Sequence, residues 1–189
     1  MFESLAVRLE GRIVALEPLG PQHVEGLREA ADDERIWRWM LTRDVEAWIA
    51  DALRESDDRQ PFAVLHHGSV VGSTSYMSLA PEHRRLEIGN TWMNPSMWST
   101  GANVEAKYLL LRHAFEVVGC LRVEFKTDAL NERARGALAA LPAAFEGVHR
   151  RHMLVRGGER RDSAWYSVIV DEWPEVEENL ERRLSARLR

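Results

Sequence analysis

The chain has 189 residues, 45% of them hydrophobic and 29% charged, which is typical of one globular domain and excludes a disordered or fibrous chain. No apolar run approaches the roughly 18 residues of a membrane span, and residues 1–10 lack the basic-then-apolar layout of a secretion signal. The single cysteine, Cys120, excludes an internal disulfide and a cysteine-based zinc site and favours a reducing cytoplasm. The net charge of −5, from 25 basic and 30 acidic residues, does not favour nucleic acid as the main partner.

Hydrophobic periodicity, together with the Gly and Pro residues, predicts the elements along the chain. We expect a strand over 7–16, broken by Gly11, then helices over 21–31 and 44–55, the second capped by Thr42 or Asp44. Further strands are predicted over 62–65, 70–79, 86–93, 121–127, 145–154 and 164–170, and helices over 101–118, 131–141 and 172–188. Three successive strands before the long helix exclude a regular alternation of strand and helix. We therefore expect one α+β domain over 1–189, a mixed sheet covered by helices on both faces.

The most informative segment is a strand, a turn of small residues and a helix, over 86–113. The first turn of a helix leaves about four backbone N–H groups free, and its dipole favours an anion there. Ser99, Thr100, Gly101, Ala102 and Asn103 would let a diphosphate approach the backbone. On spacing alone, an ordinary capped helix is an equally open reading. The segment has neither the three glycines of a dinucleotide fingerprint nor the Gly-Lys-Ser/Thr of a Walker loop.

Gly89 lies inside the strand pattern of this segment and indicates a bulge or a close backbone approach. Strict alternation divides the strand into two faces, unless a bulge shifts the phase. The faces are Glu87, Gly89, Thr91 and Met93, against Leu86, Ile88, Asn90 and Trp92.

Six stretches in chain order carry a family resemblance over nearly the whole chain. They are LEGRIVALEPL (9–19), LEIG (86–89), NVEAKYLLLRHAFE (103–116), RVEFKTDALNERAR (122–135), FEGVHR (145–150) and WYSVIVDEWP (165–174). With these stretches the chain resembles the GNAT-superfamily N-acetyltransferases, in the RimJ/RimL-like group that acetylates ribosomal-protein N-terminal alanines. The set is specific to the family and does not specify a substrate.

The resemblance implies a mostly antiparallel sheet that splays between its fourth and fifth strands, with acetyl-CoA in the gap. Backbone groups around Trp92, Met93 and Asn94 would hold the pantetheine arm, and the loop over 99–103 would hold the pyrophosphate. Asn131 matches the asparagine that contacts the arm, although its position also suits a helix N-cap. Trp98 stands where the family has Gln or Arg, and Ala134 where relatives often have Ser.

The implied reaction is attack of a neutral amine on the acetyl thioester, without a metal. An α-amine, with a pKa near 8, needs only a weak base at neutral pH. Glu87 is the candidate base and Tyr166 the candidate proton donor to the thiolate. The alternatives are structural: a Glu87 that is simply paired with a cation or lies at the surface, and a Tyr166 that simply packs in a strand. Cys120 and His113 are predicted to be packing residues.

The sequence thus predicts a cytoplasmic, acetyl-CoA-dependent N-acetyltransferase, a homodimer by analogy, that acts on a protein N-terminus or a small amine. Two alternatives remain open. Trp98 and Ala134 favour a non-catalytic acyl-CoA-binding module. A basic hairpin over 149–161, with His149, His152 and five arginines, favours docking on the ribosome or a nucleic acid. Trp37, Trp39 and Trp48 are expected in the core or at the acceptor cleft.

Overall fold

The protein is built on one eight-stranded sheet, seen in a computed structural model that describes residue 2 and residues 4–187. The strands lie in the order β1 (Leu9–Glu10), β2 (Ala15–Pro18), β3 (Arg59–His66), β4 (Ser69–Ala80), β5 (Arg85–Met93), β6 (Arg122–Asp128), β8 (Glu159–Ile169) and β7 (Ala144–Val155). Neighbouring strands are antiparallel except β5 and β6, which are parallel. The predicted mixed, mostly antiparallel sheet is confirmed.

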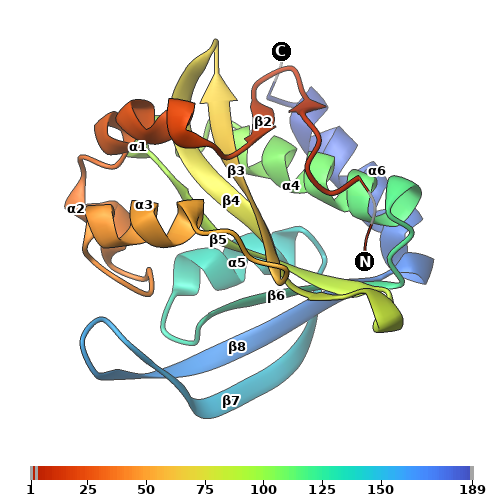
Figure 1. The fold of residues 1–189 in the computed structure, drawn as a ribbon. Coiled ribbons are helices and arrows are strands. Elements are labelled where there is room, and N and C mark those ends of the chain that lie inside the picture. The colour runs from red at the N-terminus through yellow and green to blue at the C-terminus, as the bar shows by residue number, and fades with distance from the viewer. Residues whose placement is uncertain (1, 3, 188–189) are drawn as a thin grey trace.

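Helices cover both faces of this sheet (Figure 1). On one face α1 (Val24–Ala30), α2 (Glu34–Trp37) and α3 (Val45–Leu53) enclose a small core that includes Trp92. On the other face α4 (Ala102–Arg112), α5 (Glu132–Ala140) and α6 (Trp173–Ser185) enclose a larger core. No helix in the described part of the chain is long and apolar enough to cross a membrane.

Most element boundaries follow the local signals that predicted them, and the exceptions have physical causes. Asp44 caps α3, since its carboxylate accepts the N–H of Ala47 at 3.0 Å. The helix predicted over 21–31 begins as a 3₁₀ turn at Pro21–His23. The helix predicted over 101–118 is α-helical to Arg112 and then continues as a π turn, His113–Val117.

Three further differences concern elements that the sequence pattern describes poorly. The short helix α2, capped by Asp33, was not predicted because one turn leaves almost no periodic pattern. Strand β8 begins at Glu159, five residues early, because its charged first residues pair with β7 across the hairpin. The last helix ends at Ser185, and Leu188, its predicted end, lies outside the described residues.

A buried carboxylate on α4 fastens the N-terminal turn to the sheet. Glu105 is 4% exposed and accepts the backbone N–H groups of Arg12, Ile13 and Val14 at 2.9, 2.6 and 2.7 Å. A side chain at Gly11 would collide with this carboxylate, so glycine is required there. Glu105 therefore holds the β1–β2 turn against the helix whose N-terminus forms the candidate anion site.

We predict that Glu105→Ala lowers the free energy of unfolding by about 3 kcal/mol, because three buried or partly buried N–H groups lose a charged acceptor. Chemical denaturation followed by circular dichroism measures the change. The control is Glu178→Ala, which removes an exposed glutamate of α6 and should leave stability almost unchanged. Equal stability of the two variants would contradict the role given to Glu105.

Candidate active site

The site is formed where two parallel strands stop pairing. β5 and β6 pair only through Arg85 with Arg122, Leu86 with Val123 and Glu87 with Glu124. Beyond these residues β5 stays with β4 to Met93, and β6 stays with β8 to Asp128. The predicted interruption between the fourth and fifth strands of the family is therefore present, and these strands are β5 and β6 because the short β1 is counted first.

A bulge in β5 lies beside this interruption. Ser75 pairs with Gly89 and Ser73 with Trp92, so Asn90 and Thr91 together lie opposite Thr74. Asn90 adopts a left-handed backbone with φ +50° and accepts the indole N–H of Trp48 at 3.2 Å. The extra residue reverses the alternation beyond Gly89.

The bulge shifts the phase of the second half of β5, which is the exception that the predicted alternation allowed. Thr91 contacts Lys107 of α4, and Met93 belongs to the α4–α6 core, whereas Trp92 lies among α1–α3. Before the bulge, Leu86 and Ile88 belong to the α4–α6 core, which leaves Glu87 on the α1–α3 face. The bulge lies one residue later than Gly89 had indicated.

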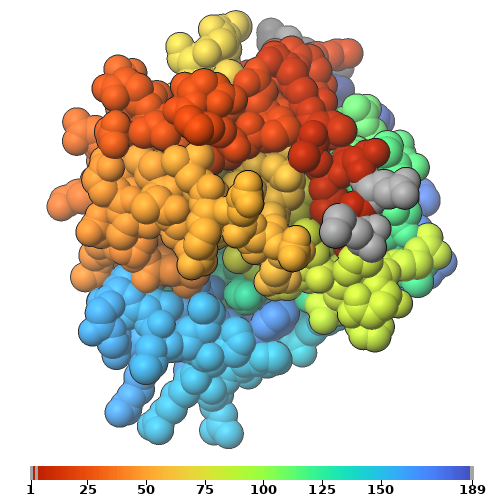
Figure 2. Space-filling view, viewed as in Figure 1, coloured from red at the N-terminus to blue at the C-terminus, as the bar shows by residue number. Residues whose placement is uncertain are grey.

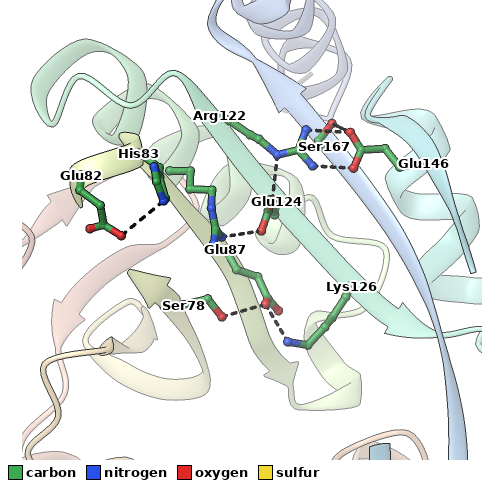
Figure 3. Close-up of polar contacts among 10 residues, drawn as sticks. Ser78, Glu82, His83, Glu87, Arg122, Glu124, Lys126, Glu146 and Ser167 are labelled. Atoms are coloured by element: carbon green, nitrogen blue, oxygen red, sulfur yellow. Dashed lines mark hydrogen bonds and ion pairs between the residues drawn. The ribbon is translucent and has the colours of Figure 1, made fainter. Parts of the chain in front are cut away.

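Glu87 is buried, 1% exposed, and paired (Figure 3). Its carboxylate lies 2.8 Å from Lys126 Nζ and accepts the Ser78 hydroxyl at 3.4 Å. The Lys126 ammonium in turn lies 5.3 Å from the centre of the Trp165 ring. The carboxylate is therefore held by two partners, an ammonium group and a hydroxyl.

Tyr166, the candidate proton donor, lies on the opposite face. Its ring belongs to the α4–α6 core and its hydroxyl oxygen accepts Arg135 Nε of α5 at 3.2 Å. Since the hydroxyl proton is not used in that bond, it remains available to a ligand. The sheet thus separates the two residues that the sequence had grouped as catalytic.

Lys107 of α4 is a charged residue of this region that the sequence analysis did not select. Its Nζ donates to Thr91 Oγ1 at 3.0 Å and lies 5.4 Å from the centre of the Phe125 ring. Burial of the ammonium lowers the pKa of Lys107 to about 7, and the Glu87 carboxylate opposes that shift. A lysine surrounded by Ala106, Leu110 and Leu111 on the inward side of a helix was the available signal.

The loop before α4 has the geometry of an anion site. Ser99 and Gly101 adopt left-handed backbones with φ +65° and +103°. The Thr100 hydroxyl accepts the N–H of Ala102 at 3.2 Å, which removes one predicted donor. The N–H groups of Asn103 and Val104 have no hydrogen-bond partner among residues 2 and 4–187. These two donors at a helix N-terminus fit a phosphate.

Arginines from distant segments supply positive charge to this loop. Trp98, which replaces the basic residue of the family, lies between Arg133 of α5, with its guanidinium 3.7 Å from the ring centre, and Arg35 of α2, at 5.4 Å. Arg187 donates to the Ser99 carbonyl. Arg35 is paired with Asp33, whereas Arg133 has no carboxylate partner among the described residues, and burial lowers its pKa. The residues present therefore fit the diphosphate of a CoA ester.

Several hydrogen-bonding groups of the residues predicted to hold a pantetheine arm already have partners within the protein. Asn131 Oδ1 accepts the N–H of Ala134 at 3.1 Å, so this side chain caps α5. The N–H of Asn94 donates to Val71 and its carbonyl accepts Met97, while the Met93 carbonyl accepts the Trp98 indole. Trp92 faces the small core and offers only its backbone.

An open cavity of about 520 Å³ lies between the α2–α3 loop and the β7–β8 hairpin. It is bounded by residues 41–44, between α2 and α3, and by residues 154–158 at the tip of the β7–β8 hairpin. Figure 2 shows this hairpin against the segment of α2 and α3. The Arg156 N–H donates to the Leu41 carbonyl at 2.9 Å, and Arg43 pairs with Glu159 at 3.0 Å.

The hairpin is less basic on its surface than its sequence indicates. The side chain of Arg156 is 5% exposed and pairs with Asp128 and Glu159. Arg161 is also buried. Arg150, Arg151 and Arg160 remain exposed.

The other singled-out residues take part in packing. Trp37, Trp48 and Trp92 form a cluster with ring centres 5.3 to 6.2 Å apart. His113 is buried against Tyr76. Burial raises the pKa of the Cys120 thiol to about 11. The described residues hold no group of three His, Cys, Asp or Glu side chains that could bind a metal.

Comparison with known proteins identifies the family. Residues 14–141 match the acetyltransferase (GNAT) domain, and the chain belongs to that family. A GCN5-related N-acetyltransferase from Brucella melitensis is 33% identical, with a TM-score of 0.85 over 94% of this chain and 85% of that one. Mycobacterium smegmatis RimJ in complex with CoA-disulfide has the same fold, with a TM-score of 0.84 at 21% identity over 97% of both chains. The uncharacterized N-acetyltransferase YoaA of Bacillus subtilis (strain 168) is 28% identical over 100 residues, 53% of this chain and 55% of YoaA, so the chain matches about half of that relative.

Proposed function

We propose that the protein transfers an acetyl group from acetyl-CoA to a primary amine, either a protein N-terminal alanine or a small amine. The observation that carries this proposal is the end of β5–β6 pairing at Glu87, together with α4, which contacts β5 beyond that point through Lys107 and Thr91 and has two N–H groups without a partner among the described residues at its N-terminus. Membership of the GNAT family and the fold shared with a CoA-bound RimJ support it. We further propose a homodimer in a reducing cytoplasm, where Cys120 would stay a thiol.

The two faces of the sheet suit the two substrates. The diphosphate would lie at the N-terminus of α4, and the acetyl group would reach the gap from the α4–α6 face. The amine would enter from the α1–α3 face, past the cavity between α3 and the hairpin. Glu87 lies on that face and would accept the proton of the amine, directly or through a water molecule.

Titration calorimetry with acetyl-CoA and desulfo-CoA tests the proposal first. We expect saturable binding to one site per chain, followed by thiol release with at least one member of a panel of amines and N-terminal peptides. A chain that binds acetyl-CoA but releases no thiol would be a binding module. A chain that binds neither would contradict the proposal altogether.

We predict that Arg133→Ala weakens acetyl-CoA binding about tenfold, because the loop before α4 would lose the guanidinium that is proposed to form an ion pair with a phosphate of the ligand. Binding of acetyl-pantetheine, which lacks the diphosphate, should not change. Arg182→Ala, which removes an exposed arginine of α6, is the matched control. Parallel losses for both ligands would show that Arg133 supports the fold instead.

We predict that Glu87→Gln lowers kcat about 100-fold while the affinity for acetyl-CoA is kept, because the amide cannot accept a proton. Steady-state kinetics across pH, with the thermal midpoint of the variant as a check on folding, measures this. Glu82→Gln changes an exposed glutamate five residues before Glu87 and outside β5, and it should leave kcat unchanged. An unchanged kcat would assign the proton transfer to water alone.

A further inference from the structure

Lys107 places an ammonium group between the two strands that have stopped pairing. On β5 its partner, Thr91, lies four residues beyond the last paired residue, Glu87, and on β6 the ring of Phe125 follows the last paired residue, Glu124. The Thr91 hydroxyl also lies 2.8 Å from the hydroxyl of Thr74. The side chain therefore reaches from α4 into the gap where the thioester is proposed to lie.

The ammonium has little compensation there. No carboxylate forms an ion pair with Lys107 among the described residues. The negative charge of Glu87 attracts the ammonium group from the opposite face of the sheet, but Glu87 is itself paired with Lys126 of β6. On the α4–α6 side, the hydroxyl oxygen of Tyr166 on β8 accepts Arg135 Nε of α5, which places a second cation on that face. An amine in an apolar setting is costly to keep charged and readily gives up its proton.

We propose that Lys107 donates the proton that the CoA sulfur takes up when the acetyl group leaves. This inference rests on the function proposed above. The substrate nitrogen forms its bond to the acetyl carbon, the carbon–sulfur bond breaks, and the sulfur keeps the electron pair and takes a proton from Nζ. The proton lost by the substrate amine leaves through Glu87 on the other face, and the neutral Lys107 regains a proton from solvent. The products are the amide and the CoA thiol.

The energetics of this transfer are favourable. An ordinary thiol has a pKa near 8.5, whereas burial brings the pKa of Lys107 to about 7, so the proton moves to the stronger base. The arrangement also separates the two proton transfers, since the donor lies on the α4–α6 face and Glu87 on the α1–α3 face. An acid and a base on opposite sides of the reacting carbon cannot neutralise each other directly.

The first test follows bound CoA and needs no acceptor. The thiolate of CoA is titrated by ultraviolet difference absorbance on the wild type, Lys107→Met and Lys107→Arg. Because Lys107 has lost its proton above about pH 7, we expect the thiol of bound CoA to ionise at the same pH in the wild type and in Lys107→Met. In Lys107→Arg, whose permanent charge stabilises the thiolate, we expect it to ionise at lower pH. A thiol that ionises as low in the wild type as in Lys107→Arg would show that Lys107 keeps its proton, and would overturn the inference while leaving CoA binding intact. Absence of CoA binding would overturn the proposed function as well.

The second test uses turnover. Lys107→Met should lower kcat about 100-fold with the affinity for acetyl-CoA kept, and should remove the fall in kcat above about pH 7 that deprotonation of Lys107 imposes. Lys107→Arg, which keeps a charge but does not give up its proton, should not restore kcat. Thr91→Val removes the hydrogen bond to Lys107 and serves as the structural control. Rescue by arginine, or equal losses in Thr91→Val and Lys107→Met, would show a structural or purely electrostatic role and overturn the proton transfer.

Discussion

The rest of the structure depends on the short parallel pairing of β5 with β6. Three residue pairs join the two strands. Glu124, at the end of this ladder, forms ion pairs with Arg85 at 3.2 Å and with Arg122 at 2.8 Å. Beyond it each strand keeps its other neighbour, β4 or β8, so the opening is fixed by two antiparallel ladders. In the described residues the ladder between β5 and β6 does not resume beyond Glu87 and Glu124, because each strand follows its other neighbour.

The bulge at Asn90 makes this opening chemically asymmetric. With one extra residue in β5, Thr91 turns toward α4 and its lysine, while Asn90 and Trp92 turn toward α1–α3. Glu87 keeps the α1–α3 face because it lies before the bulge. A ligand in the gap therefore meets an ammonium group on one side and a carboxylate paired with Lys126 on the other. In an apolar surrounding such fixed charges act more strongly than in water.

The candidate anion site shows how a departure from the family pattern can be compensated by residues distant in the sequence. The loop itself has lost its basic residue to Trp98, yet the indole serves as a platform for Arg133, and Arg187 reaches the same loop from beyond α6. The cation is therefore supplied by another helix, and the tryptophan fixes its position. The two free N–H groups of α4 can donate directional hydrogen bonds to an anion, which a positive charge alone does not provide.

The sequence by itself determined the order of the elements apart from α2, offered Asp44 and Asn131 among its candidate caps, and placed Glu87 within a strand. These follow from periodicity and capping, which involve residues a few positions apart. Only the tertiary structure decided that Lys126 pairs with Glu87, 39 residues away, that Lys107 meets Thr91, 16 residues away, and that Arg133 lies on Trp98. The tertiary structure also decided which face of the sheet each side chain of β5 takes beyond Gly89, because the position of a bulge depends on pairing with the partner strand. Such contacts depend on how elements distant in sequence pack, and no local pattern encodes them.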